Sequence, residues 1–199
     1  MRSNVCKIDQ GSKDRAAILK ESEKVAKYNG LDRKKTMQLR LLCEEIDGML
    51  PNIIREFEGD FWIEFEEGLC KINVSILVPE FSTAKKEELI GIAKDKKNAA
   101  ARGLVGKIRS AIESFFLNEE MVSAFDASAG AFYLAAGYSD GANYSHFWSL
   151  EQYRSTVKKE ERAEAWDELE KSVISSIADD VIVGVKGKRA DIVIVKNFA

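Results

Sequence analysis

Apolar residues recur every three or four positions from residue 37 to residue 54, and this is the clearest helical pattern in the chain. The residues that share one side of this predicted helix, and should face a core, are Leu39, Leu42, Ile46, Met49 and Ile53. Glu44 and Gly48 lie one turn apart on another side, where they present neighbouring places for a ligand. The same spacing is also typical of an ordinary solvated face. Asp32 is suited to cap the helix, and Pro51 should kink or end it.

Alternating apolar and polar residues predict two hairpins. In the first, Phe61, Ile63 and Phe65 point one way, and after a turn at Glu67-Gly68 the even-numbered positions from Cys70 to Val78 share one face. The opposite face, with Lys71, Asn73 and Ser75, should be exposed to solvent. The second hairpin places Val181, Val183 and Val185 on one strand, a turn at Gly187-Lys188, and a last strand from Ala190 to Val195.

Further helical patterns precede and separate the hairpins. They cover residues 13–29, where Gly30 follows as a stop signal, a short helix from Ser82 or Thr83 to Ile92, a helix carrying Leu104 and Ile108, and one from Leu150 or Lys158 to Ala178. The order is helix, helix, strand, strand, helix, helix, strand, strand. This order predicts an α+β fold, a two-layer α/β sandwich with a mostly antiparallel sheet and helices on one face. We expect a single domain over residues 1–199, with an insertion at about 118–149.

Composition narrows the class of protein. With 45% hydrophobic and 32% charged residues, the chain is an ordinary globular one. Its net charge of -3 provides no excess of positive charge of the kind that binds nucleic acid. The longest apolar run is far shorter than the roughly 20 residues that span a bilayer, so we expect no membrane segment and a cytoplasmic location. The three cysteines should be reduced thiols, with Cys43 and Cys70 in the core.

Basic residues and glycines cluster just before the helix that carries Leu104. They are Lys94, Lys96, Lys97, Asn98, Arg102, Gly103, Gly106 and Lys107. Cationic side chains and the free N–H groups of a helix start suit a phosphate or another anion. A solvated lysine loop leading into a helix is the competing interpretation. The segment lacks the spacing of a GxxxxGK[ST] phosphate loop.

The predicted insertion is rich in glycine, alanine, serine and aromatic residues and shows no sustained period. It holds His146, the only histidine. Its aromatic residues would suit a cover over the domain or a contact with a second chain. An enzyme whose site is built here from Asp126, Tyr133, Asp140, Tyr144 and His146 is a third interpretation, although no spacing among them fits a metal site or a catalytic triad.

The order of elements resembles that of the GHKL (Bergerat-type) histidine kinase-like ATPase family, and most of all the small anti-sigma-factor serine kinases. QLRLLCEEIDGML is similar to the family's N-box helix, and FWIEFEEGLCKINVSILV to the two strands that follow it. AAARGLVGKIRSAIES is similar to the glycine-containing lid-to-helix segment, and DDVIVGVKGKRADIVIVK to the closing hairpin. The likeness covers roughly residues 13 to 115 and 165 to 196.

The resemblance assigns roles to particular positions. Glu44 matches the N-box acid that orients or activates the reacting water or hydroxyl. Gly48 stands where the family has the Asn that binds magnesium, and a glycine has no side-chain oxygen to offer. If Glu45 is the matching acid instead, Met49 takes the Asn position. Asn52, two turns after Glu44, would substitute only in a distorted helix.

The lid-to-helix segment and the end of the second strand complete the implied site. Phosphates would be held by Lys97, Asn98, Arg102 and the backbone from Gly103 through Leu104 to Gly106. At the family's adenine-binding Asp this chain has Ile76 or Leu77, and loss of one such hydrogen bond costs on the order of 1–3 kcal/mol.

Two functions follow from the resemblance. The first is a divergent nucleotide-binding regulatory protein, anti-sigma-like or sensor-kinase-like, that binds ATP or ADP with little or no catalysis and without clear support for magnesium. If it is active, Glu44 is the general base. The second is a non-catalytic protein-interaction scaffold that has lost nucleotide binding. Both imply a regulatory protein partner, and the family resemblance and the aromatic insertion favour a homodimer.

Overall fold

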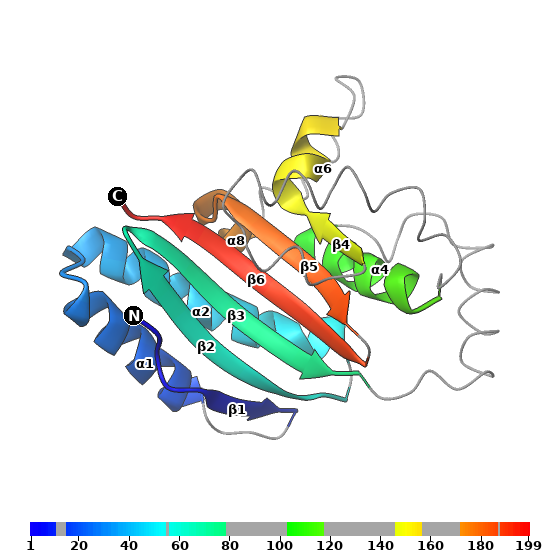
Figure 1. Cartoon of the computed structure of the whole chain (residues 1–199), viewed down its shortest axis with the longest axis horizontal. Coiled ribbons are helices and arrows are strands. Elements are labelled where there is room, and N and C mark those ends of the chain that lie inside the picture. The colour runs from blue at the N-terminus through cyan, green and yellow to red at the C-terminus, as the bar shows by residue number, and fades with distance from the viewer. Residues whose placement is uncertain (11–14, 55, 79–102, 118–145, 157–171, 187) are drawn as a thin grey trace.

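The computed structural model describes residues 1–10, 15–54, 56–78, 103–117, 146–156, 172–186 and 188–199. Six strands form one antiparallel sheet in the order β1-β2-β3-β6-β5-β4 (Figure 1). They are β1 (Cys6–Asp9), β2 (Glu58–Glu66), β3 (Leu69–Leu77), β4 (His146–Ser149), β5 (Asp180–Lys186) and β6 (Arg189–Asn197). The predicted α+β class and antiparallel sheet are therefore confirmed.

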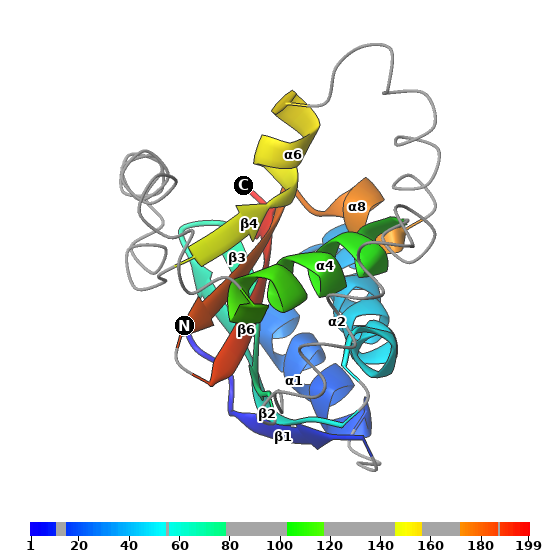
Figure 2. The ribbon, with the colours of Figure 1, turned by 90° about the vertical axis from the view of Figure 1, so that its right-hand side faces the viewer.

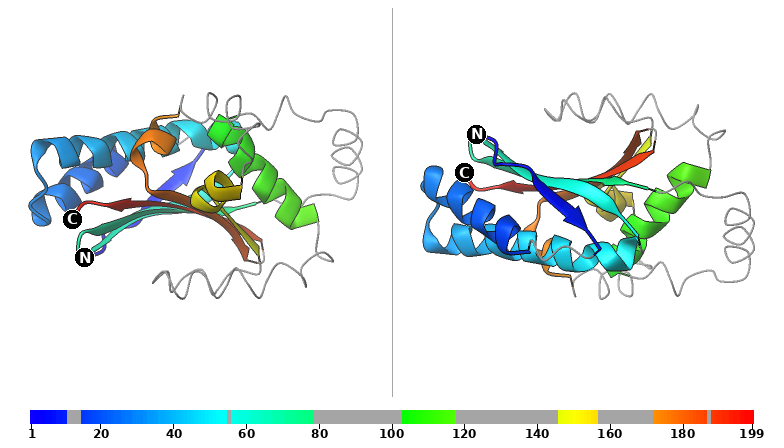
Figure 3. Two further views of the ribbon diagram at one scale, coloured as in Figure 1. Left: turned by 90° about the horizontal axis from the view of Figure 1, so that it is seen from above. Right: turned by 90° about the horizontal axis from the view of Figure 1, so that it is seen from below.

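The described helices that form the second layer are α1 (Arg15–Tyr28), α2 (Arg33–Ile53), α4 (Gly103–Leu117) and α8 (Val173–Ile177). Figure 2 shows them on one side of the sheet, and the two views of Figure 3 show the same layering from above and below. A short helix, α6 (Leu150–Thr156), follows β4 directly. No helix in the described part of the chain is long and apolar enough to cross a membrane.

The predicted alternation in the first hairpin is confirmed on the face that meets the helices. Phe61, Ile63 and Phe65 are buried there, and so are the even-numbered positions of β3 from Cys70 to Ile76. The turn at Glu67-Gly68 uses two left-handed residues, with φ of 49° and 86°. The opposite face of the hairpin was predicted to be exposed to solvent. This prediction was wrong in part, because Asn73 and Ser75 are only 5% and 7% exposed.

Helix α2 packs its predicted apolar side on the sheet. Leu39, Leu42 and Ile46 are fully buried. The Asp32 carboxylate accepts a hydrogen bond of 2.8 Å from the Lys35 amide, as expected of an N-cap. Pro51 lies inside the last turn, and the helix ends at Ile53.

Two strands lie outside the predicted pattern. β1 pairs with β2 along the edge of the sheet, with Cys6 opposite Phe61. β4 pairs with β5, with Phe147 opposite Gly184. Residues 146–149 therefore belong to the sheet and not to the proposed insertion, and residues 118–145 lie outside the described residues. The sequence missed both strands because each has only four residues, too few to establish a period.

The helix predicted from residue 150 or 158 to residue 178 is described only at its ends, as α6 and α8. Residues 157–171, with Trp166 and Leu169, lie outside the described residues, and so does the predicted helix from residue 82 to 92. Within α8 the fully buried side chain is Ile174. Tyr28, the last residue of α1, is 75% exposed.

The cysteines lie where they were expected. Cys43 and Cys70 are buried in the core as predicted, Cys6 is buried as well, and none of the three is in a disulfide. Burial raises the pKa of the Cys43 thiol well above its usual value and that of Cys70 to about 12. A thiol is reactive as the thiolate, so both should be inert in the folded protein.

Candidate functional site

The acid that the resemblance assigns to catalysis lies on the side of α2 turned away from the sheet. Glu44 is separated by about half a turn from the buried positions of the helix, and its side chain is 37% exposed. Its carboxylate meets Arg40 at 3.3 Å, one turn earlier on the same helix. Arg40 also reaches Glu23 of α1 at 2.9 Å. An exposed acid held by exposed ion pairs is weakly stabilised and stays accessible to solvent.

An arginine from α1 lies over the position where the family has its metal-binding Asn. Arg15 Nε donates to Asp47 Oδ2 at 2.9 Å. A Cβ atom placed on Gly48 would meet Arg15 Nη2 at 3.5 Å. The hydrogen bond and charge of Asp47, with a smaller contribution from Glu44, raise the pKa of Arg15. The guanidinium therefore places a positive charge beside Asp47 and over Gly48.

This arrangement does not fit a magnesium ion. Magnesium takes hard oxygen ligands, and Gly48 offers no side-chain oxygen, while Asp47 is engaged by a cation. If Glu45 is the matching acid, Met49 stands at the Asn position, and its thioether side chain has no oxygen to offer magnesium. Asn52 is exposed in the last turn, next to Pro51. Among the described residues, no group of three or more His, Cys, Asp or Glu side chains is placed to hold a metal.

The phosphate-binding end of the implied site is described only from Gly103 onward. Gly103 begins α4 with φ of 66°, a conformation that favours glycine. Leu104 is 2% exposed and packs into the core, and Gly106 is buried beside it. Leu104 therefore has a structural role, and only the backbone N–H groups of this first turn suit an anion. Lys97, Asn98 and Arg102 lie outside the described residues.

Helices α2 and α4 are in contact on the same face of the sheet, and α4 also packs against β5 (Figure 2). The two segments that the resemblance makes parts of one site are thus neighbouring elements. No described contact joins Glu44 to Gly103. The third interpretation, built on the insertion, is not tested, because Asp126, Tyr133, Asp140 and Tyr144 lie outside the described residues and His146 is described only as the first residue of β4.

A polar network that the sequence did not predict lies on the sheet face opposite the helices. Arg189 donates to Asp60 Oδ2 at 3.2 Å and to Ser75 Oγ at 2.9 Å. Ser75 in turn donates to Asp191, and Lys7 meets Asp60 at 2.6 Å. The network joins β1, β2, β3 and β6. Each acid in it has a donor, so its evident role is to hold the strands in register. The alternation of polar and apolar residues could place these side chains on one face of the sheet, but it could not predict which of them form hydrogen bonds with one another.

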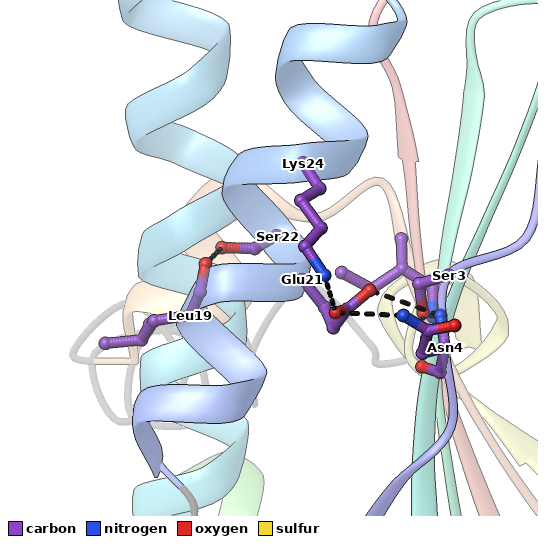
Figure 4. A network of polar contacts seen from close by, with 7 residues as sticks. Ser3, Asn4, Leu19, Glu21, Ser22 and Lys24 are labelled. Carbon is purple, nitrogen blue, oxygen red and sulfur yellow. Dashed lines mark hydrogen bonds and ion pairs between the residues drawn. The ribbon is translucent and has the colours of Figure 1, made fainter.

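A second network ties the N-terminal segment to α1. Glu21 is 7% exposed and accepts hydrogen bonds of 3.2 Å from both the backbone and the side-chain nitrogen of Asn4 (Figure 4). Lys24, one turn later, donates to the same carboxylate. Burial acts to raise the pKa of Glu21, but the hydrogen bonds from Lys24 and Asn4 outweigh it and lower the pKa below its usual value.

Replacing Glu21 by Gln should therefore destabilise the protein in a way that depends on pH. A carboxylate whose pKa is lowered on folding stabilises the protein above its unfolded-state pKa, and loses this effect as the pH falls through the folded-state pKa. We expect Glu21→Gln to cost about 1–2 kcal/mol at about pH 7, and this difference should shrink by about pH 3. Urea unfolding at both pH values measures it. Glu23→Gln, an exposed acid of the same helix, is the control, and a pH-independent cost would contradict the assignment.

Substitution of Gly48 by alanine tests whether the fold requires a glycine at this position of α2. Glycine inside a helix costs about 1 kcal/mol relative to alanine. Among the described residues, and apart from the backbone of α2 itself, a new Cβ would meet Arg15 Nη2 at 3.5 Å, an ordinary contact. We expect Gly48→Ala to stabilise the protein by about 1 kcal/mol and to raise Tm by roughly 2–4 °C. A loss of stability in thermal unfolding would show that Gly48 is required by the fold.

Comparison with known proteins adds no assignment: no protein-family model, curated protein or solved structure matches this chain significantly.

Proposed function

We propose that this chain is a regulatory protein on the histidine kinase-like ATPase plan that binds a nucleotide without magnesium-dependent catalysis. The proposed fold is supported by two hairpins side by side in one antiparallel sheet, β2-β3 and β5-β6, with an N-box-like helix α2 before the first. It is supported further by the packing of α4 against α2 on the same face. The nucleotide would be ATP or ADP.

The observation that carries the non-catalytic part of the proposal is the position of Arg15. Its guanidinium lies 3.5 Å from the place of a Gly48 side chain and pairs with Asp47. A cation that pairs with Asp47 and lies next to Gly48 repels a second cation, so it disfavours magnesium at this place on α2. We therefore expect Glu44→Gln to leave any nucleotide affinity nearly unchanged and to remove no magnesium-dependent hydrolysis.

Phosphates would be held by Lys97, Asn98 and Arg102 together with the first backbone N–H groups of α4. This part rests on the resemblance and on the start of α4 at Gly103 with a left-handed backbone. The free N–H groups of a helix start favour a negatively charged group. The proposed regulatory role follows from nucleotide binding without hydrolysis. A protein that binds ATP or ADP but does not hydrolyse ATP can act only through the difference between its nucleotide-bound states.

Calorimetric titration with ATP and ADP, with and without magnesium, tests the proposal. The variant is Lys97→Ala with Arg102→Ala. The matched control, Lys20→Ala with Lys27→Ala, removes the same charge from exposed positions of α1. We expect binding by the unchanged protein and the control, at least tenfold weaker binding by the variant, and no dependence on magnesium.

The second candidate is a protein-interaction scaffold that has lost nucleotide binding. The contacts of α2 favour it, because Arg15 and Arg40 already engage Asp47 and Glu44. No heat of binding for either nucleotide at millimolar concentration would reject the nucleotide proposal in favour of the scaffold. Binding that requires magnesium would instead reject the argument from Arg15.

A further inference from the structure

The turn between α1 and α2 projects beyond the strands of the sheet, as both views of Figure 3 show. At the end of α1, the Leu31 amide donates to the Ala26 carbonyl at 3.0 Å, and the Gly30 amide donates to the Lys27 carbonyl at 3.2 Å. This is the usual pattern of a helix that ends at a left-handed glycine, and Gly30 has φ of 65°. Asp32 then caps α2. Hydrogen bonds therefore define the conformation of this projecting turn.

The end of the molecule around this turn is strongly basic. Residues 24–40 contain six basic residues and one acid, Asp32, although the whole chain has a net charge of -3. Lys24 pairs with Glu21, and Arg40 pairs with Glu23. In the part of the chain that the structure describes, the basic residues of this segment that make no ion pair are Lys27, Arg33, Lys34 and Lys35.

These cations do not stabilise the helix that carries most of them. Arg33, Lys34 and Lys35 lie in the first turn of α2, which holds no acid. The helix dipole favours acids in a first turn and disfavours bases. Lys35 donates to the Phe198 carbonyl, which carries no charge. The positive charge at this end is therefore not compensated by the described part of the molecule.

Exposed apolar side chains lie among the cations. Tyr28, the last residue of α1, is 75% exposed, and Met37, in the second turn of α2, is 55% exposed. These two are the most exposed large hydrophobic side chains among the described residues. Met37 lies one turn after Arg33 and Lys34, so the three share one side of the helix. We call this surface the basic tip, and it consists of Lys27, Tyr28, Arg33, Lys34 and Met37.

We propose that the basic tip is a docking surface for a membrane that contains anionic phospholipids. Clustered lysine and arginine side chains attract anionic head groups. Tyr28 and Met37 would enter the interfacial region, where apolar side chains leave water and a tyrosine hydroxyl stays hydrated. Because a bilayer is flat, only a part of the protein that projects can meet it, and the basic tip projects (Figure 3).

Other polyanions fit the basic tip less well. Nucleic acid would attract the same cations through its phosphates, but this attraction gives no role to an exposed Met37. The proposed contact is peripheral and needs no helix that crosses the bilayer. It also does not rest on nucleotide binding, because none of the tip residues except Lys27 appears in that test, and Lys27 appears there only as a control.

The proposed binding should be weak and reversible. The four cations without an ion pair are at the low end of the roughly four to eight that are typical of anionic membrane sites. Each cation near an anionic surface strengthens binding about fivefold. Because the charges are exposed, added salt should weaken the binding.

Cosedimentation with lipid vesicles tests the role of charge. The vesicles are phosphatidylcholine with about 30% phosphatidylserine, or phosphatidylcholine alone, and the unchanged protein should bind only the first. Arg33→Gln with Lys34→Gln should weaken this binding at least tenfold. The matched control, Lys20→Gln with Lys186→Gln, removes the same charge from exposed positions outside the tip and should bind as the unchanged protein does. The tip variant removes cations that the helix dipole disfavours, so unfolding would not explain a loss.

The apolar part of the contact is tested separately. Tyr28→Ser with Met37→Ser should also weaken binding to the anionic vesicles at least tenfold. The matched control is Val5→Ser with Leu77→Ser, at positions 48% and 44% exposed outside the tip, and it should leave binding unchanged.

Several results would overturn the proposal. They are no binding to the phosphatidylserine vesicles, equal binding to both kinds of vesicle, or a charge variant that binds as the unchanged protein does. An apolar variant with unchanged binding would also overturn it, because the tip would then be a site for any polyanion. Binding of a short DNA duplex by the tip in the absence of vesicle binding would assign the surface to nucleic acid instead.

Discussion

Asp180→Ala should lower the free energy of unfolding by about 3 kcal/mol, because each hydrogen bond to a buried charge contributes roughly 1.5–3 kcal/mol. Asp180 is 2% exposed at the start of β5. Its carboxylate accepts from Ser149 Oγ at 3.0 Å, from the Glu151 amide at 2.9 Å and from the Val181 amide at 2.8 Å. Alanine would leave these donors buried without an acceptor. Thermal unfolding should show Tm lowered by roughly 6–12 °C.

The size of this effect reflects what Asp180 joins. The Glu151 amide is one of the free N–H groups at the start of α6, and Ser149 caps the same helix by accepting from the Gln152 amide at 3.2 Å. Asp180 thus holds β4 and α6 on β5. Asp180→Asn keeps the shape and one acceptor oxygen, so it should cost clearly less than alanine. Equal costs for both variants would mean that the remaining amide oxygen contributes nothing and that the negative charge accounts for the whole effect.

Gly59→Ala should destabilise the protein by about 3 kcal/mol, at the upper end of what overpacking costs. A Cβ at this position of β2 would lie 2.4 Å from the Ser75 carbonyl oxygen and 3.2 Å from Ile76 Cα. Both are backbone atoms of β3, which pairs with β2 at this point. They cannot move aside without disturbing the register that the Arg189 network also holds. Urea unfolding measures the loss.

Gly48→Ala is the matched comparison, since the same substitution is expected to stabilise α2. The contrast depends only on what each new Cβ would meet, a strand backbone at Gly59 and the end of a flexible side chain at Gly48. A Gly59→Ala protein as stable as the unchanged one would show that β2 and β3 can separate locally at this point.

The local pattern of apolar and polar residues was sufficient to predict most of the described helices and strands. The period of α2 predicted its buried side from Leu39 to Ile53, and Asp32 predicted its start. Alternation predicted β2, β3, β5 and β6, and for β2 and β3 it also predicted the face that meets the helices. These predictions succeeded because side-chain direction in a helix or strand repeats along the chain itself. The candidate site was predicted less well, because Glu44 and Gly48 could be placed on one side of α2 but not related to anything beyond it.

The sequence by itself determined α1, α2, α4 and the strands of the two hairpins, their order, and the apolar faces of α2, β2 and β3. Only the tertiary structure decided the pairing of Cys6 with Phe61 in β1 and β2, the position of Arg15 over Gly48, and the contact of Arg189 with Asp60. Each joins residues that are 33 to 129 positions apart. Periodicity carries no information about such pairs, because which segments meet, and in which register, depends on how the whole sheet and its helices pack.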